Sequence, residues 1–191
     1  GAAGDGLEDA LREYHAEHGR LFSTAYTVFK TLNNATGLQD TIKSYCKVID
    51  YIYENIEAIA GSIMGASSAE ASCKSMESIP GFGPFLAYEV WCDLILLKVV
   101  KWGENDYVNV GPGAIDGLKI IYKEVENYKL PNDEWGEYIW ELQGLQEQYL
   151  PKEYPGKRLT LRSIEHSLCE YRKYHNIKRG KGHMKLFNPK T

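Results

Sequence analysis

Apolar residues recur at three- and four-residue steps through most of the chain, which is the period of amphipathic α-helices. Between residues 5 and 32 the recurring apolar positions are Leu7, Leu11, Tyr14, Leu21, Phe22, Tyr26 and Phe29. Gly19 divides this stretch into two predicted helices, because glycine is a poor helix former. The sequence Asn33-Asn-Ala-Thr-Gly37 predicts a turn. The helical pattern then resumes from residue 38 to residue 63.

Further helices are predicted along the rest of the chain. Ser67 or Ser68 is placed to cap a short helix that runs through Met76. The most apolar segment, from about Phe85 to Trp102, predicts a helix in the core of the fold. Three more helices are predicted over about 114–128, 131–149 and 159–175. Because strand signals are weak, the predicted fold class is all-α, a compact bundle of seven or eight helices.

Two short glycine turns interrupt these helical patterns. The first lies at residues 80–84 and contains Gly81, Phe82 and Gly83, and the second contains Gly111 and Gly113. A helix–hairpin–helix element needs one glycine for a positive φ and another that lets backbone N–H groups approach a phosphate. We therefore predict such an element and assign these five residues to DNA binding. The alternative is a close turn between helices that holds no ligand.

The charge distribution along the 191 residues is uneven. Residues 151–191 carry eleven basic and three acidic side chains, a balance of +8, which leaves −12 on the preceding 150 residues. A basic end on an acidic body favours a polyanionic partner, although a solvated tail is the alternative. We expect residues 1–4 to be a cloning remnant, residues 5–176 to form a single helical domain, and residues 177–191 to be a basic C-terminal extension.

Several function classes are excluded by what the sequence lacks. The four cysteines stand far apart, so reduced, intracellular thiols are expected, with Cys92 buried in the core. His15 and His18 have no third ligand nearby, so we expect no metal.

A Walker motif is absent, so the chain is not itself a kinase, and no cofactor is expected. No apolar run is long enough for a membrane span. A glycosylase of the lyase type would carry a lysine just after the first glycine turn. Pro84 and Phe85 occupy that place, which argues against lyase chemistry.

Two segments together carry a family resemblance. The first is Ile79-Pro-Gly-Phe-Gly-Pro-Phe-Leu-Ala-Tyr-Glu-Val-Trp-Cys-Asp93, followed by Asn109-Val-Gly-Pro-Gly-Ala114 and Gly117-Leu118. The second is Leu161-Arg-Ser-Ile-Glu-His-Ser-Leu-Cys-Glu-Tyr-Arg-Lys173. In this order they resemble the helical domains of thymine-hypermodification systems. That group includes the alpha-glutamyl/putrescinyl thymine pyrophosphorylases and the helical domain of 5-hydroxymethyluracil DNA kinases, and it is distantly similar to helix–hairpin–helix DNA glycosylases.

The resemblance implies a chemistry and a set of residues for it. In such enzymes an amine displaces pyrophosphate from a pyrophosphorylated 5-hydroxymethyl group on thymine in DNA. Glu165, Glu170 and Lys173 match the signature helix and are the predicted catalytic residues of such a transferase. Asp93 and Asn109 join them, because glycosylase-like proteins carry a base-pocket residue at this distance from the hairpin. Carboxylates would accept a proton from the amine, and a cation would hold the leaving pyrophosphate.

The cations of the last helix complete the predicted interface. Arg162, Arg172, Lys178 and Arg179 are expected to contact DNA. The resemblance implies DNA with a modified thymine as a partner, together with a kinase or other domain of the same pathway. It also implies an intracellular location, the nucleus in a eukaryote or the host cytoplasm for a phage.

One departure from the family pattern keeps other functions open. The segment from Phe22 to Gln39 lacks the arginine expected in catalytic members and offers Lys30, Asn33 and Asn34. A non-catalytic DNA-binding module, or a reader of a modified base, is therefore the main alternative. A domain that docks a basic protein on its acidic surface is the third.

Overall fold

The computed structural model describes residues 6–19, 21, 29–126, 134–150 and 158–181. Within these ranges all regular structure is helical, which confirms the predicted all-α class. The chain divides into two compact units, Gly1–Gly103 and Glu104–Thr191. The single helical domain over residues 5–176 stays a prediction. In the part of the chain that is described, no helix combines the length and apolar character needed to cross a bilayer.

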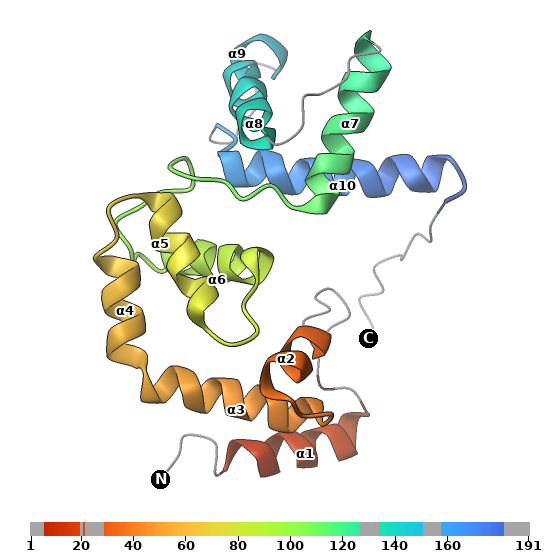
Figure 1. Ribbon diagram of the computed structural model, residues 1–191. Helices are drawn as coiled ribbons and strands as arrows, with labels where there is room; N and C mark the ends of the chain where they lie inside the picture. The colour runs from red at the N-terminus through yellow and green to blue at the C-terminus, as the bar shows by residue number, and fades with distance from the viewer. Residues whose placement is uncertain (1–5, 20, 22–28, 127–133, 151–157, 182–191) are drawn as a thin grey trace. The chain divides into compact units, whose positions relative to one another are not determined.

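The first unit contains six α-helices and a 3-10 helix in its described part (Figure 1). They are α1 (Leu7–His18), α2 (Phe29–Thr36), α3 (Thr41–Glu54), α4 (Ile56–Met64), α5 (Ala69–Ser75), η1 (Met76–Ser78) and α6 (Pro84–Leu96). Helix α3 packs against α1 and α2, and α5 packs against α4 and α6.

Local capping explains several of these boundaries. Gly19 ends α1 with a φ of 68°, as predicted, and Ser68 caps α5 by accepting from the N–H of Ala71. The turn predicted at residues 33–37 is wrong for all but its last residue, since α2 continues to Thr36 and Gly37 then takes a φ of 71°. Buried Leu32 anchors this helix. The helical stretch predicted from residue 38 to 63 divides at Asn55 into α3 and α4.

Helix α6 is shorter than the sequence pattern predicts. It ends at Leu96, because Lys98 takes a left-handed conformation with a φ of 58°. The N–H groups of Lys98 and Val99 then donate to the carbonyls of Ile95 and Leu94, which closes the helix end. Residues 97–102 are therefore not helical. Leu96, Leu97 and Val99 are exposed and do not belong to the core.

The core of the first unit lies where α4, α5 and α6 meet. Trp91 and Tyr88 of α6 are fully buried there. The Trp91 indole N–H donates to the Ser72 hydroxyl at 3.1 Å, and that hydroxyl donates to the Ile63 carbonyl at 2.8 Å. This chain of hydrogen bonds satisfies the buried polar atoms that join the three helices.

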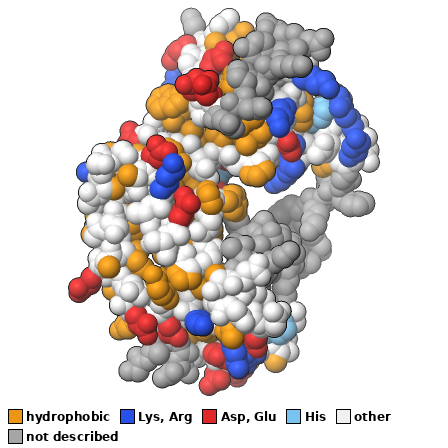
Figure 2. Space-filling model, viewed as in Figure 1, with side chains coloured by type: hydrophobic (Ala, Val, Ile, Leu, Met, Phe, Trp, Pro, Cys, Tyr) orange, Lys and Arg blue, Asp and Glu red, His pale blue; other side chains and the backbone are white. Residues whose placement is uncertain are grey.

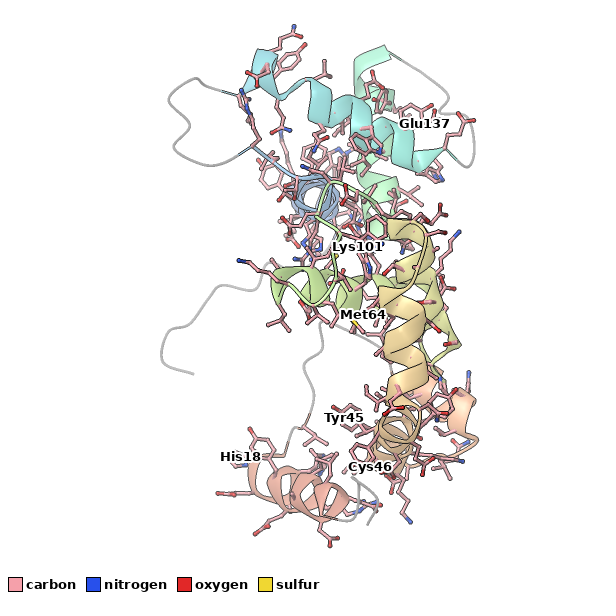
Figure 3. All side chains as sticks on the ribbon, turned by 90° about the vertical axis from the view of Figure 1, so that its left-hand side faces the viewer. His18, Tyr45, Cys46, Met64, Lys101 and Glu137 are labelled. Atoms are coloured by element: carbon pink, nitrogen blue, oxygen red, sulfur yellow. The ribbon has the colours of Figure 1, made fainter. Side chains whose placement is uncertain are left out.

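The cysteines of the described residues are free thiols, as expected, and Cys92 is buried with 1% exposure. Cys46 is buried on α3, on the side that faces α1 (Figure 3). Burial raises its pKa, and burial also raises the pKa of Cys73 to about 12. These thiols act as small core residues.

The second unit contains four helices in its described part: α7 (Pro112–Glu126), α8 (Trp135–Gly144), α9 (Gln146–Tyr149) and α10 (Leu161–Lys178). Helix α10 lies across α7 and also packs against α8 (Figure 1). The single helix predicted over residues 131–149 is wrong, since α8 and α9 meet at Leu145, and residues 131–133 lie outside the described ranges. The last helix runs three residues beyond its predicted end.

Side-chain amides hold the start of α10. The Asn105 side-chain oxygen accepts from the Leu161 N–H at 3.0 Å and from Gln143 at 2.7 Å. Gln146 is buried and bonds both backbone groups of Leu159, donating at 2.9 Å and accepting at 2.6 Å. Thr160 caps the helix by accepting from the Ser163 N–H, so the loop before α10 is fixed by several partners.

Candidate nucleic-acid interface

The first glycine turn connects η1 to α6 and has one packed and one open glycine. Gly81 has a φ of 83°, which a side chain would make strained. A Cβ on Gly81 would stand 2.7 Å from Leu32 Cδ2 of α2. At Gly83 a Cβ would meet nothing within 4 Å. Half-buried Phe82 donates its N–H to the Ile79 carbonyl at 2.9 Å, which closes the turn.

The helices on either side of this turn are unequal. Helix α6 has thirteen residues, whereas η1 has three and follows the seven-residue α5. Gly83 is the N-cap of α6 and Pro84 is its first residue. A helix–hairpin–helix element at this turn stays a prediction.

The second glycine turn is packed on α10. The Gly111 N–H donates to Glu165 Oε1 at 3.1 Å, and a Cβ on Gly113 would stand 2.5 Å from Cys169 Sγ. One turn further into α7, a Cβ on Gly117 would stand 2.4 Å from the Leu168 carbonyl oxygen. The absence of side chains at these three positions therefore lets α7 approach α10 closely. The predicted contact of Gly111 and Gly113 with phosphate stays a prediction.

Glu165 lies on the packed face of α10 and is only 7% exposed. One of its oxygens accepts from the Gly111 N–H, and the other lies 3.8 Å from Nε2 of exposed His166. A carboxylate near the first turn of α7 is also favourably placed with respect to the positive end of that helix dipole. The residue therefore fastens the second turn to α10.

Glu170 and Lys173 form an exposed ion pair on α10. Lys173 Nζ donates to Glu170 Oε1 at 2.5 Å, and this hydrogen bond is the main reason that the pKa of Lys173 is raised. The two residues stand three positions apart, a spacing that puts both side chains on one face of a helix. Because both side chains are exposed whereas Glu165 is buried, the three predicted catalytic groups of α10 do not converge on one point.

The other predicted catalytic residues are divided between the units. Asp93 is exposed on α6 of the first unit. Asn109 is half-buried in the loop before α7 of the second unit. Their catalytic roles stay predictions.

The four cations predicted to bind DNA lie on α10 or at its end. Arg162, near the start, lies 3.4 Å from Glu104, and Arg172 lies 3.8 Å from Asp116. Lys178 ends the helix and Arg179 follows it, both exposed. Figure 2 shows Lys and Arg side chains gathered over this end of α10. Cations are also favoured there by the negative end of the helix dipole.

A pocket that the sequence does not indicate lies among α7, α8, α9 and α10 and encloses about 710 Å³. Its walls are mostly leucine, isoleucine and tyrosine side chains. The Tyr122 hydroxyl donates to Glu141 Oε2 at 2.8 Å, and both residues line the pocket. Helical periodicity alone predicts a closed core here, because the same apolar stripe serves a filled interface and an open one.

The outer surface of α8 is acidic. Glu137, labelled in Figure 3, is exposed in its first turn, and Glu141 is exposed one turn later. The cations at the end of α10 and the carboxylates of α8 therefore give the second unit two regions of opposite charge.

Comparison with known proteins gives a family match over nearly the whole chain. A family model described as "5-hmdU DNA kinase, helical domain" matches residues 3–183. The 5-hmdU DNA kinase of Bacillus phage SP10 is 28% identical over 180 residues, which cover 87% of this chain and 28% of the phage protein. The chain therefore spans little more than a quarter of that relative's length. No solved structure matches.

Proposed function

Because the chain belongs to the family of 5-hmdU DNA kinase helical domains, we propose that it binds DNA within a thymine (5-hydroxymethyluracil) hypermodification system. The observation that carries the proposal is the family match over residues 3–183, which spans both units. The phage relative is named for a kinase that acts on DNA carrying 5-hmdU. DNA that carries the modified thymine is accordingly the proposed partner, and for a phage protein the host cytoplasm is the proposed location.

The basic end of α10 is the proposed contact with the DNA backbone. Lys178, Arg179 and Lys181 are exposed within four residues, and half-buried Arg172 lies about two turns before them. Clustered cations attract phosphates whatever the base sequence, so this contact supplies affinity rather than specificity.

The first glycine turn is the proposed second backbone contact. Gly83 leaves open space at the first turn of α6, where the helix dipole favours an anion. Each contact is proposed for its own unit.

A charge-reversal experiment tests the proposed DNA binding. Lys178→Glu/Arg179→Glu should weaken binding to a fluorescent duplex at least tenfold, since two attractive charges become repulsive. Lys43→Glu/Lys47→Glu makes the same charge change on exposed positions of α3 and should have a much smaller effect. Equal losses in the two double variants would refute the assignment to α10. Undetectable binding of the unaltered chain at low salt would refute DNA binding itself.

Amine transfer to a pyrophosphorylated 5-hydroxymethyl base is a second candidate activity, and the Glu170–Lys173 pair supports it. These residues place a carboxylate and a cation 2.5 Å apart on an exposed face. The activity predicts pyrophosphate release when pyrophosphorylated DNA and an amine are supplied together. Release that is equal in the chain and in Glu170→Gln would exclude this pair. No release with any amine would leave the non-catalytic binding function.

A kinase or another domain of the same pathway is the proposed protein partner. The phage relative is more than three times as long as the segment that this chain matches. Co-purification of this chain with a kinase that acts on 5-hydroxymethyluracil in DNA would support such a partner. Separate elution of the two proteins at low salt would contradict it.

A further inference from the structure

The pocket of the second unit has the size and lining of a small-ligand site. Its volume of about 710 Å³ lies within the range of about 300–1,000 Å³ that is typical of such sites. Tyr122, Tyr149 and Tyr171 contribute rings, and Leu142 and Leu145 contribute aliphatic walls. Tyrosine rings and leucine side chains favour a planar aromatic ligand, because its faces can be buried against them.

Most polar atoms of the pocket are already used within the protein. The Gln146 amide is engaged with the backbone of Leu159. The Ser167 hydroxyl donates to the Ser163 carbonyl at 2.7 Å. Gln146 and Ser167 therefore already have hydrogen-bond partners within the protein and do not require a ligand.

Glu141 is the exception, because its carboxylate has more acceptor positions than the structure uses. Tyr122 donates to one oxygen at 2.8 Å, whereas a carboxylate offers about four lone-pair sites. An ionised carboxylate accepts only, so the ligand edge that meets Glu141 must carry an N–H or O–H donor. The Watson–Crick edge of each nucleobase carries such an N–H.

The pocket also lies in line with the cations at the end of α10. Ile164, Ser167 and Tyr171 line the pocket at helical spacing, and Lys178 continues the same stripe two turns later. Seven residues of α-helix correspond to about 10 Å, which is within the reach of a nucleotide and its neighbouring phosphate. A base in the pocket and a phosphate at Lys178 can therefore belong to one strand.

We propose that this pocket binds an unstacked nucleobase of DNA, with the ring against the tyrosines and its Watson–Crick N–H on Glu141. The proposal rests on the proposed DNA binding, and it places the base-reading site in the second unit rather than at either glycine turn. The base must leave the duplex stack to enter, so single-stranded or flipped-out DNA is the form that binds.

Methyl NMR of the whole chain tests the pocket directly with free nucleosides. Titration with thymidine or 5-hydroxymethyl-2′-deoxyuridine should shift the methyl signals of Ile121 and Ile164, which line the pocket. The methyl signals of Ile139, which is buried outside the lining, and of Ile63 in the first unit should stay in place. N3-methylthymidine, which lacks the donor, should bind about tenfold more weakly, because it loses a hydrogen bond to a charged group.

Two variants with matched controls locate the site. Ser167→Trp should abolish the nucleoside-induced shifts by filling the pocket from an exposed position, whereas His166→Trp, its exposed neighbour outside the lining, should preserve them. Glu141→Leu, which leaves no acceptor at this position, should remove most of the preference for thymidine over N3-methylthymidine. Glu137→Leu on the same helix should leave that preference intact. Their methyl spectra without ligand show whether each variant is folded.

The outcomes separate this inference from the proposed function. Nucleoside shifts that Ser167→Trp removes support the pocket, even if duplex binding by α10 fails. Duplex binding without any nucleoside shift overturns the pocket and leaves the proposed function standing. Nucleoside shifts that persist in folded Ser167→Trp would also overturn it, because the ligand would then bind elsewhere.

Discussion

The two glycine turns carry the same sequence signal and have different surroundings. At the first turn, Gly83 faces open space, although Gly81 is packed against Leu32. At the second turn, Gly111 donates to a buried carboxylate and Gly113 is in contact with Cys169. A glycine pair between helices therefore does not by itself decide what the turn contacts, because α2 packs on Gly81, α10 packs on Gly111 and Gly113, and Gly83 is left open.

The largest expected effect is in α7, one turn beyond the second glycine turn, where a single methyl group should disrupt the packing of α7 on α10. Gly117→Ala places a Cβ 2.4 Å from the Leu168 carbonyl oxygen, so the backbone must shift. We expect a loss of about 3 kcal/mol in the free energy of unfolding, as for a severe overpacking change. Chemical denaturation measures it. Gly136→Ala near the start of α8 is the control, because its Cβ meets nothing and should change the free energy of unfolding by no more than about 0.5 kcal/mol. A neutral Gly117→Ala would contradict the close packing.

Removal of the buried carboxylate should have the next largest effect. Glu165→Ala leaves the buried Gly111 N–H without its acceptor, at a cost of about 1.5–3 kcal/mol. Glu165→Gln keeps an oxygen acceptor and should lose less. Glu170→Ala removes only an exposed ion pair and should cost under about 1 kcal/mol. If Glu165→Ala proved as stable as Glu170→Ala in the same denaturation experiment, Glu165 would not fasten the second turn.

Alkaline pH should weaken the first unit, where burial raises the pKa of Cys73 from 9.0 to about 12. The folded thiol keeps its proton at pH values where the unfolded thiol loses it, so stability is complete below pH 9 and falls as the pH rises toward 12. The expected loss is about 1 kcal/mol between pH 9 and pH 10 for this one group. Denaturation curves at the two pH values measure it, and Cys73→Ala is the control. A pH dependence that is unchanged in that variant would contradict the assignment.

The smallest effect on stability is expected at the open glycine of the first turn. Gly83→Ala should change the free energy of unfolding by no more than about 0.5 kcal/mol, because φ is −87° and no atom is in the way. Its effect should instead appear in DNA affinity, since a Cβ blocks a phosphate from the start of α6. Gly61→Ala on α4 is an equally open control. Duplex affinity that is the same in both variants would remove the first turn from the interface.

Much of the fold and the family can be predicted from the sequence. The helical class, the break at Gly19 and the cap at Ser68 follow from local chemistry, and the structure confirms them. The predicted resemblance to the helical domain of 5-hydroxymethyluracil DNA kinases is confirmed by the family match. The end of α6 could not be predicted, because no glycine or proline marks the left-handed conformation of Lys98.

The site is harder to predict because its features depend on long-range contacts. Gly111 meets Glu165 across 54 positions of sequence, so neither residue alone indicates the bond. A spacing of three residues is compatible with the Glu170–Lys173 pair, which is a local contact. The same spacing separates Arg162 from Glu165, but Arg162 lies beside Glu104 and Glu165 accepts from Gly111. The pocket is formed by three separate segments, and each of them has the ordinary periodicity of a core helix. Spacing therefore identifies candidate pairs within one helix, whereas contacts between different helices leave no mark in it.

The salt dependence of DNA affinity tests the central claim that the basic end of α10 contacts phosphates. The measurement compares the slope of log K against log salt concentration for the unaltered chain and for Lys178→Gln/Arg179→Gln. Loss of two phosphate contacts should make the slope less steep by about 1.8, since each neutralised phosphate of duplex DNA contributes about 0.9. Equal slopes for the two proteins would contradict the claim, because the cations of α10 would then release no counterions on binding.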